Sequence, residues 1–174
     1  MQKVILKYGL IAGGIVSVVM LLGTTLWADV AFSNEYGELI GYTTMIIALS
    51  LIFFGVKSYR DNYQSGVINF GKGFQIGILI TAIASVMYAG TWEVALQTQP
   101  KLSNFMDNYT AKHLEKMKER GASAEEIETE SQKMDKMIAM YKNPLLRFGM
   151  TLVEILPVGI LITLLSAAIL RKKE

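Results

Sequence analysis

Long apolar stretches dominate the pattern of hydrophobic and polar positions along the chain. A helix of about 20 mostly apolar residues is needed to cross the hydrocarbon core of a bilayer. Stretches close to this length are found at about residues 8–27, 39–56, 74–96 and 145–170. The pattern therefore predicts an all-α fold, a four-helix transmembrane bundle that makes residues 1–174 a single membrane domain.

The segment between the third and fourth stretches, about residues 101–142, is charged and carries apolar residues at helical spacing. Gly121 is a suitable end for a first helix, and Ser123 with Glu126 forms the capping-box pattern that begins a second. We therefore expect a helical hairpin. It serves either as a cap over the bundle, which we favour, or as a docking surface for an envelope partner. Its lone histidine, His113, is expected to be solvated rather than a metal ligand.

Charged residues near the ends of the stretches predict the orientation in the membrane. The 57–73 linker and both termini are basic, whereas the 28–38 loop has acidic residues and no basic one. The basic residues of these flanks are Lys3, Lys7, Lys57, Arg60, Lys72, Arg171, Lys172 and Lys173. Cytoplasmic loops carry such an excess of positive charge, whereas long loops translocate largely regardless of charge. We expect both termini and the linker in the cytoplasm, and the basic-rich hairpin on the outer face of the membrane.

Composition excludes several classes of function. The net charge of +2 is too small for a nucleic-acid-binding face, and the absence of cysteine excludes disulfides and thiolate chemistry. A single histidine, with no P-loop, G-x-S-x-G or H-E-x-x-H pattern, leaves no catalytic arrangement. We predict that the protein is not an enzyme and has no cofactor and no metal. The first apolar stretch exceeds the ~7–15 residues of a signal-peptide core and is expected to be a retained helix.

Glycines four residues apart recur near the start of the first three stretches. Such pairs lie on one face of a helix and let two helix backbones approach closely in lipid. We interpret them as packing positions within the bundle, although one of them could form a self-association face. The pairs are Gly9 and Gly13, Gly37 and Gly41, and Gly73 and Gly77.

Two carboxylates within the apolar stretches, Glu93 and Glu154, form the candidate polar site. Ionisable residues inside a membrane are costly and are functional candidates for that reason. Pro157 follows Glu154 by three residues and frees a backbone carbonyl, and a carboxylate beside such a carbonyl suits a cation or a proton. Glu93, Thr91 or Thr151 could complete the site. The alternative is structural: Glu154 bonds a tyrosine or threonine of a neighbouring helix, and Arg147 pairs with Glu93.

Two groups of motifs resemble a known family. The first comprises residues 55–64 (GVKSYRDNYQ) and 70–74 (FGKGF), and the second comprises residues 141–144 (YKNP), 154–159 (EILPVG) and 171–173 (RKK). Together they resemble, over nearly the whole chain, the bacterial membrane family called domain of unknown function 4199, common in Bacteroidetes. The resemblance implies a small four-helix inner-membrane protein and offers no catalytic residue to carry over.

The resemblance also marks the cytoplasmic linker as family-like. The positions concerned are Lys57, Tyr59, Arg60, Asp61, Tyr63 and Lys72. From the residues themselves, we interpret this linker as an interfacial anchor with a polar turn at Arg60 and Asp61.

Two hypotheses of function follow. The first is a non-catalytic scaffold or accessory subunit that sits in the lipid bilayer and binds a membrane or periplasmic protein through the hairpin or the 57–73 linker. A homo-oligomer is a separate possibility and would count against this hypothesis if no other partner were found. The alternative is a small oligomeric ion or proton channel, or a transporter, that uses the intramembrane carboxylates Glu93 and Glu154.

Overall fold

The computed structural model describes residues 1–26, 36–102 and 104–172, with the side chains of these residues except 26 and 36–38. Lys173 and the surroundings of Gly37 therefore lie outside the description. The bundle consists of α1 (Gln2–Leu26), α3 (Tyr36–Leu49) with α4 (Leu51–Tyr63), α5 (Phe70–Thr98) and α8 (Pro144–Leu170). They provide four helices long and apolar enough to cross a membrane. The predicted all-α class and the four long apolar helices are confirmed.

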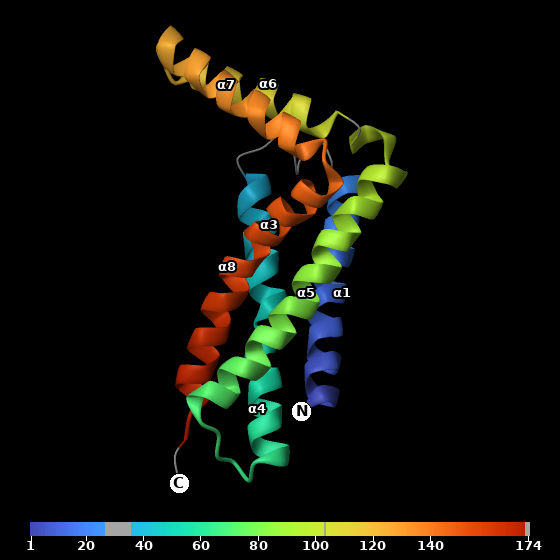
Figure 1. Ribbon diagram of the computed structural model, residues 1–174, viewed down its shortest axis with the longest axis vertical. Helices are drawn as coiled ribbons and strands as arrows, with labels where there is room; N and C mark the ends of the chain where they lie inside the picture. The colour runs from blue at the N-terminus through green and yellow to red at the C-terminus, as the bar shows by residue number, and fades with distance from the viewer. Residues whose placement is uncertain (27–35, 103, 173–174) are drawn as a thin grey trace.

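Helix α5 is the centre of the bundle, with α1 on one side and α8 on the other (Figure 1). Two glycines of α1 make the first of these contacts close. A methyl group at Gly9 would lie 2.9 Å from Ile83 Cβ, and one at Gly13 would lie 3.1 Å from Ala84 Cα. These positions agree with the expected role of the pair in helix packing.

The half of the bundle that holds both termini is tightly packed between α4, α5 and α8. A methyl group at Gly77 would lie 2.7 Å from Thr163 Cγ2, and one at Gly73 would lie 3.3 Å from Ala167 Cα. The hydroxyl groups of Thr81 and Thr163 share a buried hydrogen bond of 3.2 Å between α5 and α8. This half therefore leaves little free space between its helices.

The second predicted span differs from the structure in two ways. It is interrupted at Ser50, whose hydroxyl donates to the carbonyl of Ile47 at 2.6 Å. Such back-bonding by serine bends helices, and no break was predicted there. The helix also continues to Tyr63, so most of the predicted 57–73 linker is helical and the connection to α5 is confined to residues 64–69. The linker prediction was wrong in this respect, because polar residues at the end of a spanning helix need not end it.

Both chain termini lie at the same end of the bundle as the α4–α5 connection (Figure 1). The N–H of Lys172 donates to the carbonyl of Ile68 at 2.9 Å. Arg60 donates to Asp61 at 2.6 Å and, over a longer distance of 3.5 Å, to the carbonyl of Leu170. The predicted Arg60–Asp61 contact is therefore present, within α4 rather than in a turn.

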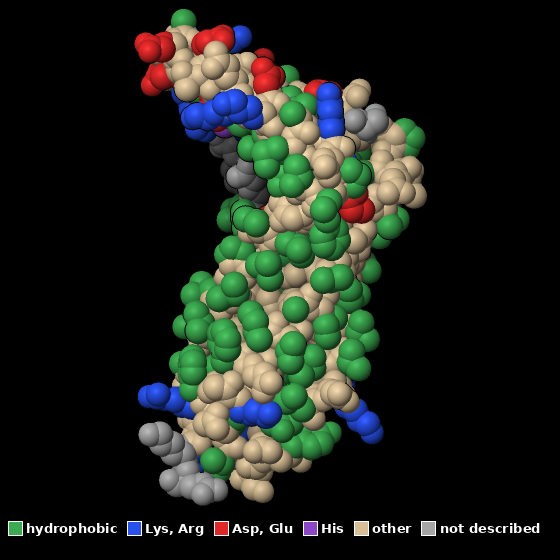
Figure 2. All heavy atoms as spheres, in the orientation of Figure 1, with side chains coloured by type: hydrophobic (Ala, Val, Ile, Leu, Met, Phe, Trp, Pro, Cys, Tyr) green, Lys and Arg blue, Asp and Glu red, His purple; other side chains and the backbone are tan. Residues whose placement is uncertain are grey.

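The surface of the bundle is apolar. Leucine, isoleucine and valine side chains are widely exposed on all four spans, with exposed fractions of 53% at Leu6, 65% at Ile47 and 69% at Val153. Charged side chains gather toward the two ends of the molecule on the face shown in Figure 2. Soluble monomers rarely expose apolar patches of this extent, and the surface suits helices that are long and apolar enough to cross a membrane.

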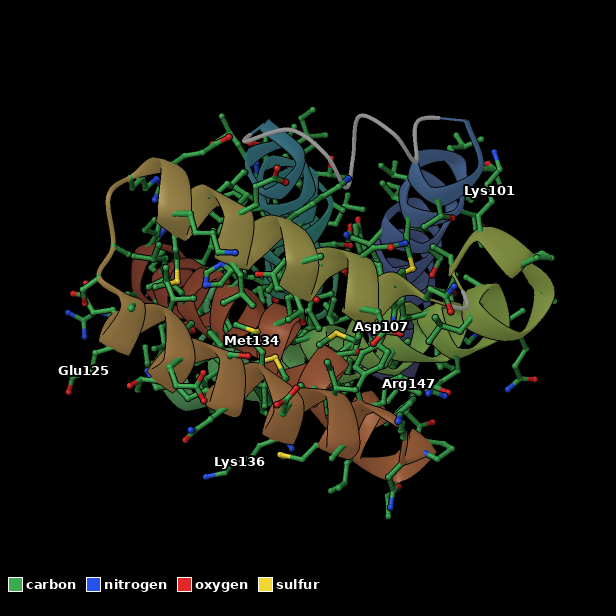
Figure 3. The ribbon with its side chains drawn as sticks, turned by 90° about the horizontal axis from the view of Figure 1, so that it is seen from above. Lys101, Asp107, Glu125, Met134, Lys136 and Arg147 are labelled. Atoms are coloured by element: carbon green, nitrogen blue, oxygen red, sulfur yellow. The ribbon has the colours of Figure 1, made fainter. Side chains whose placement is uncertain are left out.

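Helices α6 (Phe105–Glu119) and α7 (Ala124–Tyr141) lie across the other end of the bundle, side by side (Figures 1 and 3). A 3-10 turn, η1 (Pro100–Leu102), leads into them. Gly121 has a φ of +80°, and the predicted capping box of Ser123 and Glu126 is formed. Met134 lies buried between the two helices, whereas Glu125 marks the far end of the pair (Figure 3).

Candidate functional site

An ion pair joins α5 to the start of α8 below the α6–α7 pair. Arg147 Nε donates to Glu93 Oε1 at 2.7 Å, and its Nη2 donates to the other carboxylate oxygen at 2.5 Å. Both side chains are largely buried, with exposed fractions of 14% and 17%. Such two-pronged contacts between guanidinium and carboxylate are strong and fix orientation. The structural alternative for Glu93, pairing with Arg147, is therefore the one found.

Tyr141 and Trp92 extend this ion pair to α7. Arg147 Nη1 donates to the carbonyl of Tyr141 at 3.0 Å, and the guanidinium lies 5.4 Å from the centre of the tyrosine ring. The indole N–H of Trp92 donates to the hydroxyl of Tyr141 at 2.6 Å. Burial raises the pKa of Tyr141 to about 12, so the phenol is neutral at ordinary pH. We call Trp92, Glu93, Tyr141 and Arg147 the Glu93–Arg147 cluster; it fastens the α6–α7 pair to the bundle.

Glu154 lies further along α8 and has a different partner. The hydroxyl of Tyr88 on α5 donates to its carboxylate at 3.4 Å. Thr91, which the sequence suggested as part of a site with Glu154, donates to Ser17 at 2.9 Å instead. Thr151 donates to the carbonyl of Arg147 at 3.1 Å. Arg147 holds Glu93, so Glu93 pairs as in the structural alternative, and the contact of Glu154 with a tyrosine matches that alternative too.

Pro157 lies inside α8, one turn after Glu154. The helix continues through it to Leu170, and both Pro157 and Glu154 have exposed side chains. The proline therefore changes the backbone hydrogen bonding next to the carboxylate without ending the span.

A cavity of about 710 Å³ lies on the α6–α7 side of the bundle. Its walls come from α1, α3, α5 and α8, and Phe105 and Tyr141 of the α6–α7 pair close it from above. Glu154 and Tyr88 belong to its wall. A methyl group at Gly41 would meet none of the described residues within 4 Å, and Gly41 also lines the cavity. The packing interpretation of Gly41 was therefore wrong, because α3 leaves open space here.

The family-like positions on α4 and α5 lie at the opposite end of the molecule (Figure 1). Tyr59 is buried and its ring stacks on that of Tyr63 with 5.6 Å between the ring centres. Lys57 is exposed, and the ammonium group of Lys72 donates to Gln75 at 3.1 Å. These residues anchor the basic end of the bundle and take no part in the cavity.

The described residues contain no group of three histidine, aspartate or glutamate side chains that could hold a metal ion. His113 stacks on Tyr109 within α6 and lies 3.6 Å from Glu130 of α7. The predicted hairpin brings α6 and α7 side by side, but the pairing of His113 with Glu130 depends on the register of the two helices, which no local pattern specifies. His113 therefore contacts both α6 and α7, whereas we expected a solvated side chain.

Sequence reasoning did not find the cavity. One signal for its aromatic wall was present, since Tyr88 and Trp92 are four residues apart and share a face of α5. The opposite wall depends on how far α3 stands from α5, which no local pattern specifies.

Comparison with known proteins identifies the family. The model of the family described as "Protein of unknown function (DUF4199)" matches residues 7–172, and the chain belongs to this family. No curated protein and no solved structure matches the chain.

Proposed function

We propose that this DUF4199 member is a non-catalytic scaffold or accessory subunit of the bacterial inner membrane, with its termini in the cytoplasm and the α6–α7 pair outside. The observation that carries the proposal is how the α6–α7 pair is held. Its base is fastened to the bundle by the Glu93–Arg147 cluster, while its far end extends sideways past the upper end of α3 (Figure 1). A rigid arm of this kind supports a role in presenting a surface to a membrane or periplasmic protein.

The exposed end of this arm is charged on both helices. Glu125 and Glu128 lie exposed at the start of α7, and Lys118 and Arg120 lie exposed at the end of α6. Mixed charge at the rim of an interface favours specificity in the choice of partner. The base of the pair supports the role of a cap over the bundle, because Phe105 lines the upper side of the cavity.

The orientation rests on charge. The end of the bundle with both termini carries the basic flanks Lys3, Lys7 and Lys57, and its one described acidic residue, Asp61, is bonded to Arg60. Cytoplasmic ends of membrane helices carry such an excess of basic residues.

Site-specific photocrosslinking tests the scaffold proposal. A photoreactive phenylalanine at Thr129, which is exposed on α7, should form one reproducible adduct with a different protein in intact cells. Replacing Glu125 and Glu128 together with lysine should abolish the adduct, whereas Asp107→Lys at the base of α6 should leave it intact. Adducts with lipid or with copies of this chain alone would contradict the proposal.

The alternative proposal is a small oligomeric channel or transporter. It is favoured by the exposed carboxylate of Glu154 on the cavity wall. A path through one copy would have to cross the half of the bundle where Ile52, Ile76 and Ile80 are fully buried. Such a path would therefore run between copies. Reconstituted vesicles should then show a proton or cation flux that Glu154→Gln abolishes, and vesicles without any flux would rule this alternative out.

A further inference from the structure

We propose that the cavity beneath the α6–α7 pair binds an amphiphile that carries an ammonium group and an alkyl chain. This inference is independent of the scaffold proposal, because it concerns the interior of the bundle and not its exposed arm. The volume of about 710 Å³ lies within the range of small-molecule sites, which is ~300–1,000 Å³.

The first argument is charge. Glu154 is the only carboxylate that lines the cavity, and no lysine, arginine or histidine joins it among the described residues. The nearest guanidinium along α8, that of Arg147, is directed to Glu93 and to the carbonyl of Tyr141. In an apolar surrounding the attraction between a carboxylate and a cation is much stronger than in water. The wall therefore selects a cationic group over a neutral or anionic one.

The second argument is the aromatic wall next to Glu154. Tyr88 contacts the carboxylate, and Trp92 follows it by one turn on α5. The ring of Phe105 meets that of Trp92 edge to face at 5.1 Å, and Tyr141 bonds the indole N–H. All four rings line the cavity. Aromatic walls of this kind bind alkylammonium groups through the negative faces of the rings.

The third argument is the apolar remainder of the cavity. Its other walls carry side chains such as Val16, Met20 and Met45, together with Gly23 and Gly41. Within the part of the chain that the structure describes, a methyl group at either glycine would meet nothing within 4 Å, and this open space suits a ligand. An alkyl chain fits this surface, because it leaves no polar group unsatisfied. The ligand chemistry is thus a cationic amine at Glu154 with an apolar chain toward α1 and α3.

Fluorescence quenching can test this ligand chemistry directly. The chain has two tryptophans, so Trp27→Phe leaves Trp92, on the cavity wall, as the only fluorophore. The probes are 12-bromododecylamine, 12-bromododecanol and 12-bromododecanoate, in which bromine quenches indole fluorescence on contact, added to the protein in dodecyl maltoside micelles. We expect half-maximal quenching by the amine at a roughly 10-fold lower mole fraction than by the alcohol. This difference corresponds to about 1.4 kcal/mol of binding free energy, which the contacts of the ammonium group with the carboxylate and the aromatic rings would supply.

Two variants and one control make the result specific. Glu154→Gln should reduce the preference for the amine to less than about 2-fold, the loss expected when the charge contribution disappears. Glu119→Gln, an exposed carboxylate on α6, should leave the preference unchanged. Gly41→Leu places a larger side chain where a β-carbon has open space, so it should occupy part of the cavity and weaken quenching by the amine and the alcohol alike. Equal quenching by amine and alcohol, or an undiminished preference in Glu154→Gln, would overturn the proposal.

Ammonium amphiphiles have two sources, and a second arm separates them. Phosphatidylethanolamine with brominated chains is compared with phosphatidylglycerol brominated at the same positions. Selective quenching by the phosphatidylethanolamine identifies a membrane lipid as the ligand. Selective quenching by the single-chain amine alone identifies a soluble amphiphile that enters the cavity.

Discussion

The Glu93–Arg147 ion pair should be the largest single polar contribution to the stability of the bundle. The perturbation is a double-mutant cycle of Glu93→Gln, Arg147→Met and the double variant. Arg147→Met leaves a carboxylate of 17% exposure without its guanidinium and removes the hydrogen bond to the carbonyl of Tyr141. Glu93→Gln keeps a neutral oxygen that Arg147 can still use as an acceptor.

Burial sets the magnitude. Removing one partner of a buried ion pair costs about 3–5 kcal/mol, and the partial exposure of this pair places it at the lower end. We therefore expect Arg147→Met to lower the free energy of unfolding by about 3 kcal/mol. Glu93→Gln should lower it by about 2 kcal/mol, the contribution of hydrogen bonds to a charged group. The double variant should cost about 1–2 kcal/mol less than the sum of the two, because the single variants disturb the same contact.

The assay is unfolding in mixed micelles at increasing mole fractions of sodium dodecyl sulfate, followed by helical circular dichroism and Trp fluorescence. The chain supplies a matched control, the exposed Arg60–Asp61 pair, for which Asp61→Asn should cause no resolvable change. Additive effects of Glu93→Gln and Arg147→Met, or an effect no larger than that of the control, would refute the reasoning that burial makes this ion pair important.

Two further predictions concern packing and the helix cap. Gly77→Ala should destabilise the bundle by about 1–3 kcal/mol, because its methyl group would meet Thr163 and Ile52. The control Gly90→Ala has open space around it among the described residues. In the same unfolding assay it should be neutral or slightly stabilising. The N–H and hydroxyl of Ser123 hold the pKa of the Glu126 carboxyl below its ordinary value of 4.5. The charged carboxylate of the capping box therefore stabilises the start of α7 above pH 4.5, and this stabilisation is lost as the pH falls below 4.5 and the carboxyl becomes protonated. Hydrogen-exchange protection at the start of α7 should decline over this range in the natural sequence and not in Glu126→Gln, whose side-chain amide does not titrate; equal behaviour of the two would contradict the assignment.

The sequence was most informative where one local pattern decides the structure. Long apolar runs predicted the four spans, and Ser123 with Glu126 predicted the cap that begins α7. Both features depend on residues close together in the chain. Basic residues after Val56 were a weaker guide, because they mark a membrane boundary rather than a helix end, and α4 continues to Tyr63.

The candidate site was less predictable because it depends on distances between helices. Glu93 and Glu154 were interpreted either as one polar site or as two structural contacts, and the contacts found are with Arg147 and Tyr88, which approach from other helices. The cavity arises because α3 stands away from the side chains opposite it, as the open space at Gly41 shows. A glycine beside open space and a glycine in close contact look alike in a sequence.

The arrangement of the spans across the membrane is the central claim, and cysteine labelling tests it most directly. The chain contains no cysteine, so Gln2→Cys, Asn62→Cys and Thr129→Cys each provide a unique site. A membrane-impermeant maleimide applied to intact spheroplasts should label Thr129→Cys alone, and should label the other two only after the membrane is permeabilised. Labelling of Gln2→Cys or Asn62→Cys in intact spheroplasts, or protection of Thr129→Cys, would contradict the account.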